Sequence, residues 1–248
     1  MEVICAGISD IGRKRETNQD TIYISNADQF YVVADGMGGH SGGDLASTMA
    51  VKYMSEFIKS QNDPQSTPGK SLKESIMHAN NQVKNYADLN ENLRGMGTTV
   101  VSVLFGSDNI AVGNVGDSRA YLINEHQIFQ LTKDHSMVQE KVNMGIYTRA
   151  QAADDPHKNV LSRTVGYELD IEIDIFSYKP KAGDLILLCS DGLHGKVSDE
   201  DILYLISNTL LKKDVNYTNV RDCVQTLVRQ ANENGGQDNI SVILAAVC

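Results

Sequence analysis

Residues 30–40 of the chain read Phe30-Tyr31-Val32-Val33-Ala34-Asp35-Gly36-Met37-Gly38-Gly39-His40. The apolar run at the start of this stretch predicts a β-strand, and the acidic and glycine residues behind it predict a turn. An amphipathic helix is expected next, because four large side chains recur at every fourth position, at Leu45, Met49, Tyr53 and Phe57. A buried strand is therefore expected to end on an aspartate just before a helix.

Blocks of strands and blocks of helices alternate on both sides of this stretch. Further strands are predicted where short apolar or alternating runs end at turn residues, at 3–8, 21–25, 99–105, 109–115, 119–123, 127–131, 171–178, 184–189 and 239–247. The strands between residues 99 and 131 follow one another across short turns, which is typical of a meander. Helices grouped between blocks of strands predict an α+β fold rather than a parallel βαβ fold.

Three more helices are expected from their capping residues. Ser71 is predicted to cap one helix with its hydroxyl group while Glu74 reaches back to the first turn. Ser198 and Thr218 are predicted to cap two helices near the C-terminus.

Residues 132–165 are polar and helix-like, with few strongly apolar side chains. Such a segment suits a mobile excursion over one edge of the sheets, and we call residues 132–165 the flap. The chain of 248 residues, 41% of them hydrophobic, can bury one sizeable core. We therefore expect a single domain over residues 1–248 that includes the flap.

Composition excludes several classes of protein. Asp and Glu number 32 against 22 Lys and Arg, which disfavours a nucleic-acid partner because phosphate backbones require clustered cations. No apolar run approaches the ~20 residues that span a bilayer, and the first residues do not resemble a targeting segment, so we expect a cytoplasmic protein without membrane contact. The cysteines are far apart and predict neither a zinc site nor disulfides, at Cys5, Cys189, Cys223 and Cys248.

Five aspartates share one setting, a turn at the end of an apolar strand: Asp20, Asp35, Asp117, Asp191 and Asp238. Each alone is most simply a turn or cap residue. Together they are expected to converge at one sheet edge, where their like charges would need a compensating cation. An all-oxygen ligand set with little His or Cys favours Mg²⁺ or Mn²⁺ over zinc or copper. Two such ions can activate a shared water for the displacement of a phosphoryl group.

Five motifs, in this order and spacing, resemble those of the metal-dependent type 2C, or PPM, protein phosphatases. The resemblance covers nearly the whole chain and is closest to the compact bacterial members, which share the Met of the Asp-Gly-Met-Gly-Gly-His segment and carry a similar flap. The matching segments are residues 15–20 (RETNQD), 35–40 (DGMGGH), 113–119 (GNVGDSR), 190–193 (SDGL) and 236–241 (GQDNIS).

The resemblance implies a four-layer α-β-β-α sandwich of two mostly antiparallel sheets, with the flap over the metal site. It implies hydrolysis of phosphoserine and phosphothreonine in proteins by a water that bridges two divalent cations, Mn²⁺ or Mg²⁺. The implied partners are phosphorylated proteins in bacterial signalling, including a eukaryotic-type Ser/Thr kinase and its substrates, and the implied state is a monomer.

The resemblance also implies a role for each matching residue. Asp35 would bridge both metals, and the carbonyl of Gly36 with Asp20 would help to hold the second, partly through water. Asp191 and Asp238 would complete the core site, and Asp117 with Asp191 would bind a third, weaker cation. Arg15 matches the arginine that engages the substrate phosphate, whereas without Asp20 downstream it reads as part of a solvated basic patch.

The sequence departs from the family pattern at two positions. Gln19 stands where many relatives have Glu, which removes a negative charge near the metals. Met37 replaces the His that eukaryotic members can use as general acid, so the acid is unassigned. His40 is a nearby candidate for it, and its alternative role is to order the glycine loop by hydrogen bonding. His135 and His157 lie in the flap and are expected to be structural.

Three other functions compete with this interpretation. The strand, glycines and helix around Asp35 mimic a phosphate-binding cradle, but no Lys-Ser or Lys-Thr follows and the G-x-G-x-x-G spacing fails. Cys223 and Arg229 have the C-x₅-R spacing of cysteine-dependent phosphatases, but the residues between them contain no glycine and read as helix. An inactive binding module of the same fold would be expected to lose metal-binding aspartates.

Overall fold

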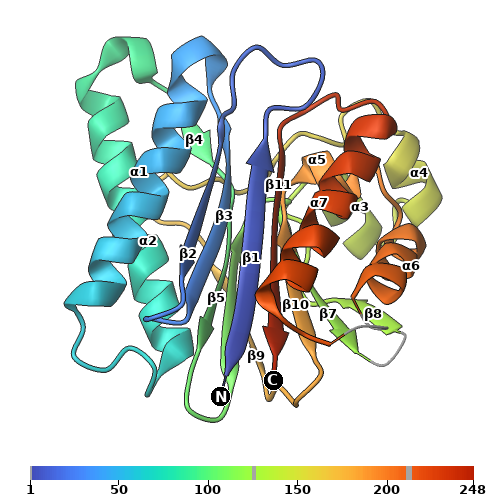
Figure 1. The fold of residues 1–248 in the computed structure, drawn as a ribbon. Helices are drawn as coiled ribbons and strands as arrows, with labels where there is room; N and C mark the ends of the chain where they lie inside the picture. The colour runs from blue at the N-terminus through green and yellow to red at the C-terminus, as the bar shows by residue number, and fades with distance from the viewer. Residues whose placement is uncertain (1, 125–126, 211–213) are drawn as a thin grey trace.

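Two antiparallel sheets pack face to face, and helices cover the outer face of each (Figure 1). The structure is a computed structural model that describes residues 2–124, 127–210 and 214–248, with the side chains of residues 39–41, 149, 153 and 154 left aside. The α+β fold and the four-layer α-β-β-α arrangement are both confirmed.

One sheet has five strands and the other has six. The first has the order β1 (Val3–Asp10), β11 (Ile240–Val247), β10 (Leu185–Cys189), β7 (Arg119–Asn124) and β8 (Gln127–Gln130). The second has the order β2 (Asp20–Ser25), β3 (Phe30–Met37), β5 (Val100–Phe105), β6 (Ile110–Val115) and β9 (Asp174–Tyr178), with β4 (Gly97–Thr98) paired to β3.

The helices pack in two groups. The second sheet is covered by α1 (Gly39–Ser60) and α2 (Pro68–Leu89), followed by the 3-10 turn η1 (Glu91–Leu93). The first sheet is covered by α5 (Asp191–His194), α6 (Asp199–Thr209) and α7 (Tyr217–Glu233). Two short helices lie in the flap, α3 (Met137–Asn143) and α4 (Arg149–Asp154).

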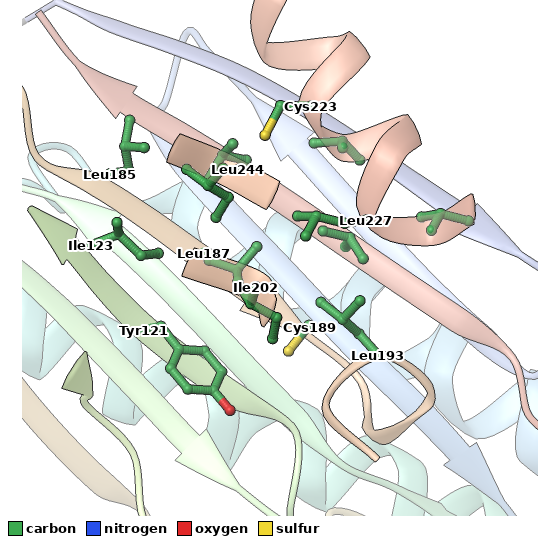
Figure 2. Close-up of a cluster of buried hydrophobic side chains, with 14 of the residues drawn as sticks. Tyr121, Ile123, Leu185, Leu187, Cys189, Leu193, Ile202, Cys223, Leu227 and Leu244 are labelled. Atoms are coloured by element: carbon green, nitrogen blue, oxygen red, sulfur yellow. The ribbon is translucent and has the colours of Figure 1, made fainter. Parts of the chain in front are cut away.

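Three apolar layers fill the spaces between the four layers of secondary structure. Figure 2 shows the layer under α6 and α7, in which Leu187 of β10, Leu227 of α7 and Ile202 of α6 point toward one another. Complete burial of one such side chain contributes about 1.5–3 kcal/mol to the stability of the fold. Because an apolar layer packs against both faces of each sheet, both faces stabilise it.

Burial on both faces explains why the predicted strands read as continuous apolar runs. In β3 the side chains of Phe30, Val32 and Ala34 face the helices, while Tyr31 and Val33 face the other sheet. Side chains alternate along a strand, so Asp35 points with Tyr31 and Val33 into the space between the two sheets. The alternation of side chains along β3 thus places Asp35, the first candidate metal ligand, between the sheets.

Two helix starts differ from the predictions, and one agrees. Ser198 caps α6, as predicted, by accepting a hydrogen bond from the amide of Asp201. Helix α7 begins at Tyr217, where Asn216 rather than Thr218 is the cap. Helix α2 begins at Pro68, so Ser71 lies buried inside the helix and does not cap it. The hydroxyl of Ser71 lies within hydrogen-bonding distance of Gln61 Oε1 and the carbonyl oxygen of Pro64.

The predicted meander between residues 99 and 131 is wrong. Strands β5 and β6 pair in one sheet, whereas β7 and β8 pair in the other. The chain therefore changes sheets at the turn of Gly116, Asp117 and Ser118. Local turn signals predict neighbouring strands, but they do not say that a turn leads from one layer to the next.

The flap is tied to the rest of the molecule at both ends. The amide of His135 donates to the carbonyl oxygen of Gly116 at 2.9 Å, and Thr98 and Val165 form an antiparallel bridge. The four cysteines form no disulfide bond. Among the described residues, no helix combines the length and the apolar character that a membrane-spanning segment requires.

Candidate functional site

Strands β2 and β3 place two of the candidate aspartates opposite each other. The antiparallel register pairs Asp20 directly with Asp35, so both side chains emerge on the face between the sheets. The backbone of Asp35 is fixed independently of its carboxylate, because its amide donates to Thr99 Oγ1 at 3.0 Å and its carbonyl accepts from the amide of Thr99 at 2.8 Å. The carboxylate of Asp35 is thus not needed to hold this residue in its strand.

The first sheet supplies two more aspartates at the same end of the molecule. Asp191 opens α5 directly after β10, and Asp238 lies just before β11, which pairs with β10. This is the end toward which the arrow of β1 points in Figure 1. Arg15, in the loop between β1 and β2, donates from its Nη2 to Asp238 Oδ2 at 2.8 Å. Its side chain is 51% exposed, so the guanidinium stays accessible from solvent.

Asp117 enters this region from the turn that joins the two sheets. The neighbouring hydroxyl of Ser118 lies 2.7 Å from Thr99 Oγ1, which is the group that accepts from the amide of Asp35. Burial lowers the pKa of His194 to about 3, so its neutral ring donates from Nε2 to the carbonyl oxygen of Asp117 at 3.0 Å. The buried Ser118 and the half-buried His194 therefore position this turn, and sequence reasoning assigned no role to either.

Sequence reasoning also missed two residues that connect the sheets. Ser190 donates its hydroxyl to Asp20 Oδ2 at 2.8 Å, and it also accepts from the amide of Ser241. Asn239 accepts from the amide of Gln19 at 2.9 Å and donates to two carbonyl oxygens of the loop before β2. Ser190 precedes Asp191 and Asn239 follows Asp238, so each lies next to a predicted metal ligand within one of the family motifs. This position was the only feature of the sequence that could have indicated their roles.

The carboxylates gather so closely that they perturb one another. Burial, together with the charges of Asp191 and Asp238, raises the pKa of Asp20 to about 7. Burial likewise raises the pKa of Asp117 to about 7 and that of Asp191 to about 6. Asp35 has a pKa well above its ordinary value because of burial and then the charges of the other four aspartates. The structure thus brings all five predicted aspartates together.

The sequence predicted that the five aspartates converge at the edge of one sheet, and this location is wrong. They meet between the ends of two packed sheets. Five charges from strands that belong to both layers could not converge on a single sheet edge. The end of the sandwich is therefore the location of the site.

A divalent cation suits this donor set. The Oδ1 atoms of Asp20 and Asp191 are buried without a hydrogen-bond partner among the described residues, which is costly unless a ligand satisfies them. Within the same residues no three Asp, Glu, His or Cys side chains surround a single ion position by themselves. A bound ion would therefore need carbonyl and water ligands as well, as Mg²⁺ ordinarily does.

Two glycines allow the backbones of the site to approach one another. A Cβ atom added to Gly36 would lie 1.9 Å from the carbonyl oxygen of Gly43, and one added to Gly192 would lie 1.9 Å from that of Asn239. These positions therefore exclude any larger residue. The glycines that mimic a phosphate cradle in the sequence let β3 and α1 pack closely. Strand β3 runs antiparallel to both of its neighbours, unlike the strand of a parallel βαβ unit.

The remaining predicted residues have varied outcomes. His40 begins α1, but its side chain lies outside the described residues, so its role as general acid stays a prediction. Gln19 contributes its carbonyl oxygen, which accepts from the amide of Gly36 at 3.1 Å. His135 is structural, as predicted, because its buried ring accepts from the amide of Gly116 at 3.1 Å. His157 is exposed and contacts Asp155.

Cysteine-dependent chemistry is excluded by the position of Cys223. Its thiol is completely buried in the layer under α7, whereas Arg229 lies exposed on the same helix. A thiolate nucleophile needs access to the phosphate, so the C-x₅-R spacing is a coincidence of helix packing.

Known proteins resemble this chain over nearly its whole length. The family described as Protein phosphatase 2C matches residues 10–245. The serine/threonine phosphatase stp of Listeria monocytogenes is 36% identical, over 95% of this chain and 92% of its own length. The crystal structure of the Mycobacterium tuberculosis serine/threonine phosphatase PstP/Ppp superimposes with a TM-score of 0.89 at 30% identity, over 100% of this chain and 99% of that one. A catalytic-domain structure of a phosphatase PstP with 2 manganese ions has a TM-score of 0.84 at 30% identity, over 99% of both chains.

Proposed function

The chain belongs to the protein phosphatase 2C family and is a protein-serine/threonine phosphatase, and we propose that it uses a water held between two divalent cations to hydrolyse phosphoserine and phosphothreonine. The observation that carries this proposal is the convergence of five aspartates between the sheet ends, with the buried Oδ1 atoms of Asp20 and Asp191 unpaired among the described residues. The similar PstP catalytic domain that binds 2 manganese ions supports the choice of metal.

Each aspartate has a proposed role in holding the metals. Asp35 lies opposite Asp20 and is affected by all four other aspartates, which suits it to contact both core ions. Asp20 and the carbonyl of Gly36 would hold one ion, partly through water, and Asp191 with Asp238 would complete the pair. When bound, Mn²⁺ or Mg²⁺ would lower the pKa of the shared water and offset the negative charge of the phosphate.

A third, weaker cation is proposed at Asp117. This carboxylate lies near that of Asp191, the residue whose charge most raises its pKa after burial itself. The turn that carries Asp117 also joins the flap through the bond from the amide of His135 to Gly116. An ion there would link the site to the flap, which we propose covers part of the site and guides protein substrates.

Metal dependence is the experiment that tests this function. We expect EDTA-treated protein to release no phosphate from a phosphothreonine peptide, and Mn²⁺ or Mg²⁺ to restore turnover with a saturable dependence. Initial rates of phosphate release across a metal titration provide the measurement. Full turnover in EDTA would contradict the proposed mechanism, and so would inhibition by a thiol-alkylating reagent.

Arg15 is proposed to bind the substrate phosphate. Its Nη2 contacts Asp238, while the rest of its exposed guanidinium can reach a phosphate that lies beside that residue. The hydrogen bond to Asp238, and then the charge of Asp238, raise the pKa of Arg15, so the cation persists at all physiological pH values. A planar guanidinium can bind phosphate through two parallel hydrogen bonds.

Arg15→Ala is therefore expected to raise KM more than it lowers kcat. A charge-assisted hydrogen bond is worth about 1.5–3 kcal/mol, which corresponds to roughly a 10- to 100-fold increase in KM. Steady-state kinetics on a phosphothreonine peptide and on a small aryl phosphate provide the measurement. Lys14→Ala, an equally exposed change one residue away, is the control and should leave KM unchanged. An unchanged KM in Arg15→Ala would return this residue to a solvated basic patch.

The cellular setting is also a proposal. The similar Listeria monocytogenes protein is a serine/threonine phosphatase, which supports a role opposite a eukaryotic-type Ser/Thr kinase. We also propose that the chain acts as a cytoplasmic monomer.

A further inference from the structure

A groove of about 630 Å³ begins beside the proposed metal site, where Met37 at the end of β3 faces residues of the segment 159–172. Met37 lies two residues beyond Asp35, which corresponds to roughly 7 Å along a strand. An extended peptide covers about the same distance in two residues. A peptide with its phosphate at the metals could therefore place a nearby side chain in this groove.

The far wall of the groove is rigidly held. Asn80 of α2 is completely buried, and its side chain accepts from the amide of Gly166 at 2.7 Å and donates to the carbonyl oxygens of Glu168 and Leu169. The bridge between Thr98 and Val165 ties the same segment to the strand that pairs with β3. These buried bonds preorganise the backbone that presents Tyr167, Glu168 and the residues after them.

The charges in the groove are unbalanced. Among the described residues that line it, Arg163 is the one basic side chain, and it already forms ion pairs with Glu172 at 2.7 Å and Asp174 at 3.0 Å. The exposed carboxylates of Glu168 and Asp170 have no ion pair among the described residues. An excess of negative charge therefore lines the groove.

Apolar side chains line the same groove as these carboxylates. Tyr167 is 59% exposed, Val160 is 41% exposed and Met37 is 38% exposed, and all three line the groove. Lysine and arginine side chains combine an apolar stem with a cationic head, so they match both surfaces together. An exposed tyrosine ring adds a favourable partner for a cation.

We propose that this groove receives a lysine or arginine side chain of the substrate, located within about three residues of the phosphorylated serine or threonine. The enzyme would thus prefer phosphopeptides with a basic residue near the phosphate. This inference rests on the proposed function, because the phosphate must be held at the metal site for the neighbouring side chain to reach Glu168 and Asp170.

The test compares phosphothreonine peptides that carry Arg, Ala or Glu at each position from three residues before to three residues after the phosphate. For the native chain we expect kcat/KM to be about tenfold higher with Arg than with Ala at one or two adjacent positions, and lower again with Glu. In the double variant Glu168→Gln, Asp170→Asn this preference should disappear, whereas turnover of a small aryl phosphate should not change.

The matched control is the double variant Asp63→Asn, Asp108→Asn, which removes two equally exposed carboxylates. Asp108 precedes β6 at the end of the sheet opposite Asp117, so this variant should keep the full preference for Arg. Equal rates on all peptides in the native chain, or an unchanged preference in the groove variant, would overturn the inference and leave the phosphatase activity intact. Loss of aryl phosphate turnover in the groove variant alone would overturn it too, because the carboxylates would then act on the metal site. Absence of turnover on every substrate with Mn²⁺ would instead contradict the proposed function.

Discussion

Asp35→Asn is expected to reduce kcat/KM by about 1,000-fold or more, because a charged group that would contact both core ions becomes neutral. Loss of several kcal/mol of electrostatic stabilisation accounts for this magnitude, since each 1.36 kcal/mol changes a rate tenfold. The fold should survive, because the hydrogen bonds that hold this position come from the backbone of Asp35 and from Thr98 and Thr99. Phosphate release from a phosphothreonine peptide at saturating Mn²⁺ measures the loss.

The same variant should be at least as stable as the native protein when metal is removed. Burial and four neighbouring aspartates raise the pKa of Asp35 well above its ordinary value, so its ionisation in the folded state costs free energy. This cost is absent below the ordinary pKa of about 3.9 and grows as the pH rises toward neutrality. In EDTA, the melting temperature of Asp35→Asn relative to the native chain should therefore increase from pH 4 to pH 7. Near-normal turnover with Mn²⁺, or marked destabilisation in EDTA, would show that Asp35 is a structural residue.

Gly192→Ala is expected to destabilise the protein by about 3 kcal/mol, at the upper end of the usual cost of overpacking. The new Cβ atom would lie 1.9 Å from the carbonyl oxygen of Asn239, so backbone must move. Asn239 cannot move alone, because its side chain bonds to Gln19, Ile11 and Thr17. A fall of roughly 6–12 °C in melting temperature is expected for a chain of this size.

Activity should fall with stability in this variant, since Asp191 and Asp238 adjoin the two residues that collide. Gly69→Ala is the control: it also lies in a helix, but its nearest neighbour is Ile175 Cγ2 at 3.3 Å, so its melting temperature should change little. A melting temperature within about 2 °C of the native value for Gly192→Ala would mean that α5 and the segment before β11 move apart easily, contrary to the packing described above.

The sequence predicted most strands because their evidence is local. Strands β3, β10 and β11 each contain a run of consecutive apolar residues next to turn residues, and both features are visible within ten positions. Capping was predicted less well. Ser198 caps its helix, but the hydroxyl of Ser71 contacts Gln61 and Pro64 instead, and no local pattern reveals those contacts.

In the candidate site, too, residues with a local signal were predicted and residues that act through distant contacts were not. The sequence identified five aspartates and Arg15 as residues that belong together, since each aspartate stands at a strand end and the motifs match a family in order. It assigned no role to Ser190, which contacts Asp20 from 170 positions away, or to His194, which contacts Asp117 across 77 positions. The charged ligands carry a strong local signal, whereas their uncharged supports resemble ordinary serines and histidines.

By itself, the sequence determined the class of fold, the order of most of its elements and the residues of the proposed metal site. Only the tertiary structure decided that the chain changes sheets at Asp117, that Asp20 lies opposite Asp35, and that the end of the β-sandwich is the location of the site. It also revealed the groove beside Met37 and its unpaired carboxylates. The physical reason is that hydrophobic periodicity and turn chemistry act over a few residues, whereas strand register, sheet packing and the meeting of distant side chains depend on the free energy of the whole core.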